Sequence, residues 1–102
     1  MGSYTRMTLT FSGELDIATT PVLRERLESR ALPGTDLLVD LRGVTFMDCT
    51  ALRALLDTHM ASIVEGWALS VAVSPGPVLR LLELTGADRR LTLASAPRVV
   101  AA

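Results

Sequence analysis

Short apolar strand patterns alternate with longer helical patterns along this chain, and the alternation restricts the fold more than any other feature. Leu37–Leu41 is nearly all apolar, which is typical of a strand buried on both faces, and residues 67–73 follow the same pattern. Tyr4–Ser12 alternates well enough for an edge strand, and residues 91–93 form a last short strand. Because helical patterns separate these strands, we expect an α/β fold with helical crossovers and a mostly parallel or mixed sheet of about four to five strands.

The first helix is predicted from its start signal. Gly13–Asp16 turns the chain, Thr20 acts as the N-cap and Pro21 occupies the first helical position. Leu23 and Leu27 then face the core, whereas the charged residues around them face water.

The second helix follows a six-residue loop at Arg42–Met47. Asp48 is predicted to cap this helix, which runs to about Glu65 and is closed by Gly66. Apolar residues at helical spacing predict its inward face: Leu52, Leu55, Leu56, His59 and Ile63. A lone histidine on such a face is more often structural than a ligand, so His59 is assigned to packing.

A third helix starts at Pro77, and Gly86 follows its end. Ser95–Pro97 has the pattern of a further helix start. No repeat or linker interrupts the chain, so residues 1–102 are predicted to form one domain. Residues 1–3 are either native or a cloning remnant.

Composition narrows the classes of function. The 49% apolar content excludes intrinsic disorder, and ten basic against eleven acidic residues leave no basic excess for nucleic acid. No apolar run reaches the roughly 18 residues of a membrane span, and the start lacks a signal-peptide pattern. The one cysteine, Cys49, cannot form an internal disulfide, which suits a reducing cytoplasm. We therefore expect a cytoplasmic protein with no direct nucleic-acid or membrane partner.

Three segments resemble the signature of the STAS domain family. Gly13–Thr19 (GELDIAT) is similar to the family's opening motif, Asp40–Leu52 (DLRGVTFMDCTAL) to its central motif, and Leu84–Ala87 to its closing segment. The resemblance implies a single STAS-like domain. Stand-alone members are bacterial anti-sigma-factor antagonists, which bind a serine-kinase anti-sigma factor and so release a sigma factor. ATP and magnesium would then belong to the partner, so no cofactor or metal is expected on this chain.

The same resemblance implies a phosphate switch on the serine that follows the motif's aspartate. That position lies where a buried strand passes by a short loop into a helix, a usual place for a site in a parallel sheet. A phosphate there would meet unpaired backbone N–H groups and the positive end of the helix dipole. It would leave the domain folded and add charge of about −1.5 to −2 to the binding surface.

Two departures from the motif bear on that switch. Cys49 replaces the phosphorylated serine, and Ala51 replaces a glycine. A serine kinase finds no hydroxyl at Cys49, whereas Thr50 beside it keeps one as an alternative acceptor. We therefore expect a constitutive antagonist, with phosphorylation at Thr50 as the other outcome. The opening is also about one strand shorter than the family's, which leaves an edge for a weak homodimer.

The expected partner surface consists of Asp16, Asp48, Cys49, Thr50 and Arg53. Asp16 is equally well explained as a turn residue. Asp48 is most simply a helix cap, a role compatible with partner contact, and Cys49 taken without its motif would be a small buried hydrophobe. No second histidine or cysteine supports a metal site.

An enzyme is the least favoured class. A cysteine at a helix start can act as a nucleophile, but no Cys-x-x-Cys motif or Gly-rich phosphate loop is present. Arg53 follows Cys49 by only four positions, too few for a phosphatase loop. The alternative to an antagonist is a STAS scaffold or accessory module of a transporter or stress-signalling assembly, without a sigma factor.

Overall fold

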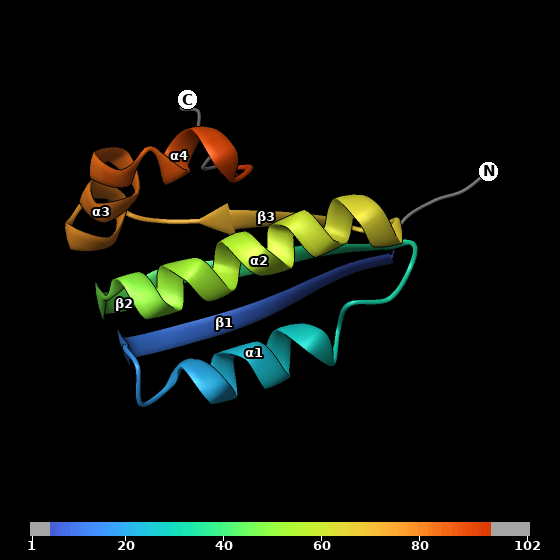
Figure 1. Cartoon of the computed structure of the whole chain (residues 1–102), viewed down its shortest axis with the longest axis horizontal. Coiled ribbons are helices and arrows are strands. Elements are labelled where there is room, and N and C mark those ends of the chain that lie inside the picture. Colours follow the sequence, from blue (N-terminus) through green and yellow to red (C-terminus); the bar gives the residue numbers. More distant parts are fainter. Residues whose placement is uncertain (1–4, 95–102) are drawn as a thin grey trace, which may run out of the picture.

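A computed structural model describes residues 5–94 of the chain as a parallel sheet with helical crossovers. The described strands lie in the order β1-β2-β3, and both pairs are parallel. Figure 1 shows α2 lying across the sheet, α1 alongside β1, and α3 and α4 on the side of β3. The elements in chain order are β1 (Thr5–Leu15), α1 (Thr20–Glu28), β2 (Thr35–Met47), α2 (Cys49–Glu65), β3 (Ala68–Ala72), α3 (Pro77–Thr85) and α4 (Ala87–Arg90).

The predicted α/β class and the crossovers are confirmed, but residues 5–94 contain fewer strands than the four to five expected. Residues 91–93 contribute one isolated parallel bridge, between Val71 and Leu93, rather than a full strand. The backbone N–H of Leu91 donates to Ala87 O at 2.8 Å, so the start of this segment closes α4 instead of joining the sheet. The helix start predicted at Ser95–Pro97 lies outside the described residues.

The core lies between the sheet and the helices. Leu23 and Leu27 of α1 are buried as predicted, and Leu55 of α2 is fully buried. The prediction that β2 is buried on both faces is wrong: Leu37, Val39 and Leu41 are buried, but Leu38 and Asp40 between them are only half-buried. These alternate positions lie on the opposite face of β2 from the buried ones.

Both long strands extend further than the sequence predicts. β1 continues through the expected turn to Leu15, and β2 continues through the expected loop to Met47. They remain paired because two register shifts accommodate the extra residues of β2. Gly43 permits the close approach at the first shift, since a Cβ there would lie 3.3 Å from the Ser12 Cβ. The turn is therefore displaced to residues 16–19.

The helix boundaries follow the predicted punctuation closely. Asp48 caps α2, Gly66 ends it in the left-handed region at φ 83°, and Pro77 begins α3. Both ends of α1 differ from the prediction. Thr19 rather than Thr20 is the N-cap, and the helix ends at Glu28, before the Leu32–Thr35 segment that was expected to end it. The Thr20 hydroxyl donates to Asp16 O at 2.8 Å, so it binds the preceding turn rather than capping the helix.

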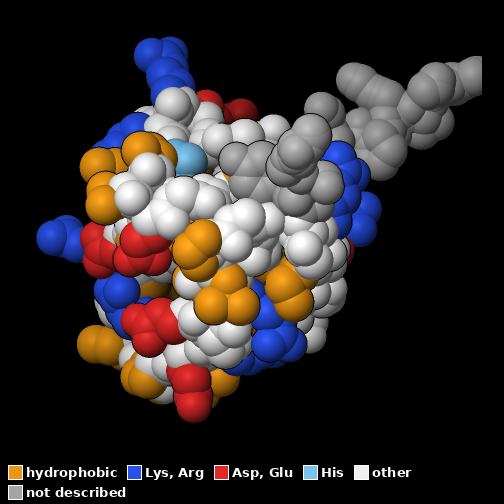
Figure 2. Space-filling view, turned by 90° about the vertical axis from the view of Figure 1, so that its right-hand side faces the viewer, with side chains coloured by type: hydrophobic (Ala, Val, Ile, Leu, Met, Phe, Trp, Pro, Cys, Tyr) orange, Lys and Arg blue, Asp and Glu red, His pale blue; other side chains and the backbone are white. Residues whose placement is uncertain are grey.

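One residue of the predicted α2 core face lies outside it. Ile63 is 67% exposed, because the buried face is centred on Leu55 and Ser62. Ile63 belongs with the exposed Met60 and Val64, and Figure 2 shows hydrophobic side chains beside the pale-blue histidine at this end of the molecule. His59 is half-buried, consistent with a packing role, and its Nδ1 has no hydrogen-bond partner.

Asp40 forms a bidentate ion pair on β2. Arg42 Nε lies 2.9 Å from Asp40 Oδ1, and Nη2 lies 2.9 Å from Oδ2. These hydrogen bonds from Arg42 lower the pKa of Asp40 below its ordinary value. Because the folded-state pKa is lowered, the pair stabilises the fold above the unfolded pKa of about 3.9 and ceases to do so as pH falls through the folded value.

We therefore expect Asp40→Asn to cause a small loss of stability at pH 7 that disappears in acid. Urea unfolding of parent and variant at pH 7 and at a pH well below 3 tests this expectation, because the contribution is lost only as pH falls through the lowered pKa of Asp40. A stability difference that is the same at both pH values would contradict a contribution from the ionised pair.

Candidate functional site

The candidate site lies where β1 and β2 end. Parallel strands bring their carboxyl ends to one edge of the sheet, at the left of Figure 1. Leu15 and Met47 are paired there, and the Asp48 backbone N–H donates to Leu15 O at 3.0 Å. The β1–α1 turn and the start of α2 are therefore adjacent in space, although about thirty positions separate them in the sequence.

Asp48 joins these two segments through its carboxylate. The Oδ1 atom accepts from the Ala51 backbone N–H at 3.0 Å, which caps α2. The Oδ2 atom accepts from the Ile17 backbone N–H, also at 3.0 Å. The cap role predicted for Asp48 is confirmed, and the second bond shows that the same side chain holds the β1–α1 turn against the helix start.

Asp16 organises the turn itself. Its Oδ1 accepts from the backbone N–H groups of Ala18 and Thr19 at 3.0 and 3.1 Å, and its half-buried side chain leaves part of the carboxylate accessible. In return, the Asp16 backbone N–H donates to the Thr19 hydroxyl at 2.9 Å. Of the two roles left open by the sequence, the turn role is therefore present in the structure.

Cys49, Thr50 and Arg53 are all exposed in the first turns of α2. Exposure at Cys49 excludes its interpretation as a small buried hydrophobe. The neighbouring Ala51 is fully buried, so the residue that replaces the motif's glycine packs into the core rather than contributing to the surface.

Two apolar residues of this edge were missed by the sequence reasoning. Ile17 is 72% exposed in the turn that Asp48 holds, and Phe46 is 47% exposed just before Met47. The sequence does contain a signal for Ile17, because it is an isoleucine next to Asp16 in an otherwise polar turn. The sequence predicts a loop at Phe46, and the outward orientation of this side chain depends on the register shift beside it in β2. Exposed apolar side chains next to polar ones are typical of a protein-binding surface.

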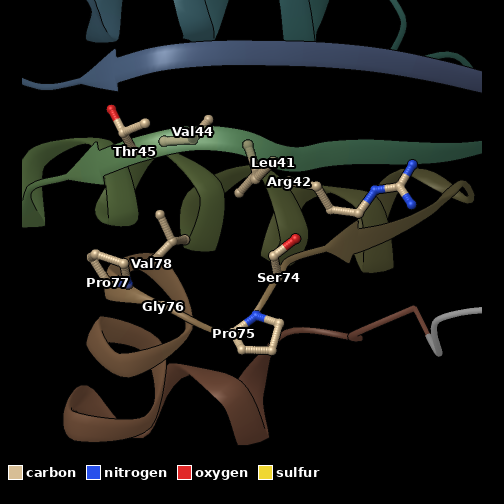
Figure 3. Close-up of a pocket in the computed structure, with 9 residues that line it drawn as sticks. All are labelled: Leu41, Arg42, Val44, Thr45, Ser74, Pro75, Gly76, Pro77 and Val78. Carbon is tan, nitrogen blue, oxygen red and sulfur yellow. The ribbon is translucent and has the colours of Figure 1, made fainter.

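A shallow hollow lies on the other side of β2 and has a volume of about 330 Å³. It is formed between β2 and the segment that leads from β3 into α3. Figure 3 shows Val44 and Val78 facing the hollow and Arg42 extending away from Val78. Its lining, which contains no histidine, cysteine or carboxylate, is Leu41, Arg42, Val44, Thr45, Ser74, Pro75, Gly76, Pro77 and Val78.

The described residues contain no group of three or more histidine, cysteine, aspartate or glutamate side chains placed to hold a metal ion. Cys49 also lacks a nearby histidine base: His59 lies ten positions along the same helix, which corresponds to about 15 Å. No described helix is long and apolar enough to cross a membrane.

Parallel strands, helical crossovers and an exposed loop–helix edge define a small α/β recognition domain. The chain belongs to the STAS domain family: residues 3–100 match the family described as Mlab, STAS domain. The resemblance seen in the sequence motifs is therefore confirmed.

Two curated relatives are anti-sigma-B factor antagonists. The chain is 35% identical over 75 residues to the anti-sigma-B factor antagonist of Bacillus subtilis (strain 168), covering 74% of this chain and 69% of the relative. It is 36% identical to the anti-sigma-B factor antagonist of Staphylococcus aureus (strain NCTC 8325 / PS 47), covering 72% of this chain and 69% of the relative.

Solved structures share the fold at low sequence identity. A Thermotoga maritima protein described as a candidate anti-sigma factor antagonist matches with a TM-score of 0.76 at 18% identity, covering 89% of this chain and 80% of that one. The murine anion transporter Solute Carrier 26 family member A9 matches with a TM-score of 0.74 at 16% identity, covering 92% of this chain and 17% of that one. At these identities the likeness shows the fold alone.

Proposed function

We propose that this chain is an anti-sigma-factor antagonist, a regulatory protein that binds an anti-sigma factor and so frees a sigma factor. The relatives at 35% and 36% identity support the role. The structural observation that supports it most directly is the Asp48 carboxylate, which joins the β1–α1 turn and the α2 start into one surface.

The binding surface consists of Asp16, Asp48, Cys49, Thr50 and Arg53, together with Ile17 and Phe46. Ile17 and Phe46 supply the apolar area, which is the part of an interface that contributes most when it is desolvated. The exposed polar residues around them would form the rim. Asp48 contributes mainly by position, because its two carboxylate oxygens already accept backbone hydrogen bonds.

The partner is an anti-sigma factor of the serine-kinase type, which carries the ATP and magnesium. This finer assignment rests on the central motif, in which position 49 is the family's phosphorylated position. Cys49 is exposed there at the first residue of a 17-residue helix. A thiol resembles an unmodified serine hydroxyl in size, so the chain corresponds to the binding-competent form of the switch.

The chain acts without catalysis of its own and in the cytoplasm, where a sigma factor would work. A thiol without a histidine base within reach supports the non-enzymatic role. The alternative of a STAS scaffold in a transporter assembly has less support. The two transporter structures that resemble this chain are only 17% and 16% identical to it, so they share its fold alone.

Binding of an anti-sigma factor from the same organism tests the proposal, with Cys49→Asp as the decisive variant. The parent should bind with micromolar or tighter affinity. The new carboxylate at the centre of the surface should weaken binding several-fold or more, because a desolvated charge without a partner is costly. Isothermal titration calorimetry of both proteins measures the difference.

Ser29→Asp is the matched control, since it adds the same charge at the exposed end of α1, away from the site. It should bind like the parent. If Cys49→Asp binds as tightly as the parent while both variants remain folded, the proposed surface is wrong.

A further inference from the structure

The outer edge of β1 is a second candidate interaction surface, in addition to the binding surface described above. β1 is the end strand of the described sheet, and no described strand pairs with its outer side. Backbone direction alternates along a strand, so every second residue presents its N–H and C=O to this edge. Thr5 N–H donates to Gly34 O, and Gly13 O accepts from the Thr45 hydroxyl, both towards β2. The even-numbered residues therefore direct their backbone groups outwards.

This edge lacks the devices that usually protect a sheet edge from pairing. β1 contains no proline, and the register shifts are accommodated by extra residues in β2. The exposed side chains of Thr8, Thr10 and Ser12 leave the edge uncharged along its middle. Helix α1 runs beside β1 in Figure 1, and its Arg26 Cζ atom lies over the core-facing ring of Phe11, 4.7 Å from the ring centre.

We propose that β1 pairs in antiparallel fashion with β1 of a second copy of this chain, around a two-fold axis at Thr10. Because the two copies are related by a two-fold axis, every contact between residues of the two β1 strands occurs twice, once in each direction. In this register Thr10 faces Thr10 of the second copy, and Thr8 faces Ser12. All three are even-numbered, so their outward N–H and C=O groups would form hydrogen-bonded pairs. Leu9 would face Phe11 on the core side.

Charge selects this register over its neighbours. Arg6 and Glu14 are the two charged residues of β1, both are exposed, and each lies four positions from Thr10. An axis at Thr10 places Arg6 of each copy opposite Glu14 of the other. An axis at Leu9 or Phe11 keeps the side chains on the correct faces but places Arg6 or Glu14 opposite an uncharged residue.

Neither the Arg6 nor the Glu14 side chain makes a strong ion pair within its own copy. The Arg6 Nε lies 3.7 Å from Asp36 Oδ2, and the Arg6 side chain is 88% exposed, so this surface pair contributes little. Backbone pairing would stop before Glu14, whose carbonyl already accepts from the Thr19 hydroxyl at 3.3 Å. Glu14 would therefore contribute its side chain alone, and the pairing between Thr8 and Ser12 forms a short interface with correspondingly weak affinity.

Charge reversal tests the pairing and its register together. Sedimentation velocity across a range of concentrations should show the parent in a monomer–dimer equilibrium. Arg6→Glu alone and Glu14→Arg alone each place like charges opposite one another twice per dimer, and each should weaken association about tenfold. The double variant Arg6→Glu/Glu14→Arg restores opposite charges and should return association to near the parent value.

The matched control reverses two exposed charges on α3, Arg80→Glu and Glu83→Arg, with the same changes in net charge; it should leave association unchanged. A parent that stays monomeric at every concentration overturns the proposal. So does a dimer that the single reversals do not weaken or the double variant does not restore. Because this test needs no anti-sigma factor, its outcome is independent of the proposed function.

Discussion

Replacing Asp48 with alanine should lower the free energy of unfolding by about 2–3 kcal/mol. Loss of a helix N-cap typically costs about 1 kcal/mol, and loss of a second hydrogen bond to a charged acceptor costs a further 1.5 kcal/mol or more. Asp48 makes both bonds, to Ala51 N–H and Ile17 N–H. For a domain of this size, thermal unfolding followed by circular dichroism should show a midpoint lower by on the order of 10 °C.

Two further variants separate this role from a general effect of charge. Asp48→Asn keeps one oxygen that can accept, so its stability should fall between those of the parent and Asp48→Ala. Asp57→Ala removes an exposed carboxylate from the same helix, where it pairs with Arg24 at 3.1 Å, and should cost less than about 1 kcal/mol. Equal destabilisation by Asp48→Ala and Asp57→Ala would contradict the joining role of Asp48.

The helix boundaries could be predicted because their signals are local. Asp48, Gly66 and Pro77 each act through the backbone conformation or hydrogen bond of their immediate neighbours. The one-residue error at Thr19 and Thr20 arose where two adjacent threonines offered the same signal. The alternation of strands and helices likewise sufficed for the parallel order, because it determines which connections can cross the sheet.

The extents of the strands could not be predicted because they depend on distant partners. Residues 42–47 resemble a loop until they are seen opposite residues 12–15 of β1, where Gly43 allows the strands to approach. The same limit applies to Ile63, whose position at the correct helical spacing does not reveal that the buried face is centred on Ser62.

The candidate site was predicted in part. The motif located Asp48, Cys49 and Thr50, and the structure places them together at the start of α2. The bond from Ile17 N–H to Asp48 Oδ2 spans 31 positions, so no local pattern contains it. The sequence therefore predicted that the turn and the helix start belong to one partner surface, and the structure adds the hydrogen bond that joins them.

The parent protein should remain unphosphorylated by its kinase partner, whereas Cys49→Ser should gain a phosphate. Position 49 is exposed at the first residue of α2, so a serine there would be accessible and its phosphate would lie at the helix N-terminus. Thr50 is exposed as well, so exposure alone does not decide between the two positions. The direction of the side chain distinguishes the two positions. One residue along an α-helix turns the side chain by about 100°, so the Thr50 hydroxyl points away from the direction in which a kinase would find a serine at position 49.

Incubation with the anti-sigma factor and ATP, followed by intact mass measurement, distinguishes the outcomes. Parent and Thr50→Ala should keep their masses, and Cys49→Ser should gain one phosphate whether or not Thr50 is also replaced. The phosphorylated Cys49→Ser protein should then bind the anti-sigma factor several-fold more weakly, because the phosphate adds charge of about −1.5 to −2 to the interface. The parent would stay bound under the same conditions, so its activity would follow its abundance. A phosphate on the parent that disappears in Thr50→Ala would overturn constitutive antagonism and make Thr50 the switch, since the helix dipole also reaches the second residue of α2.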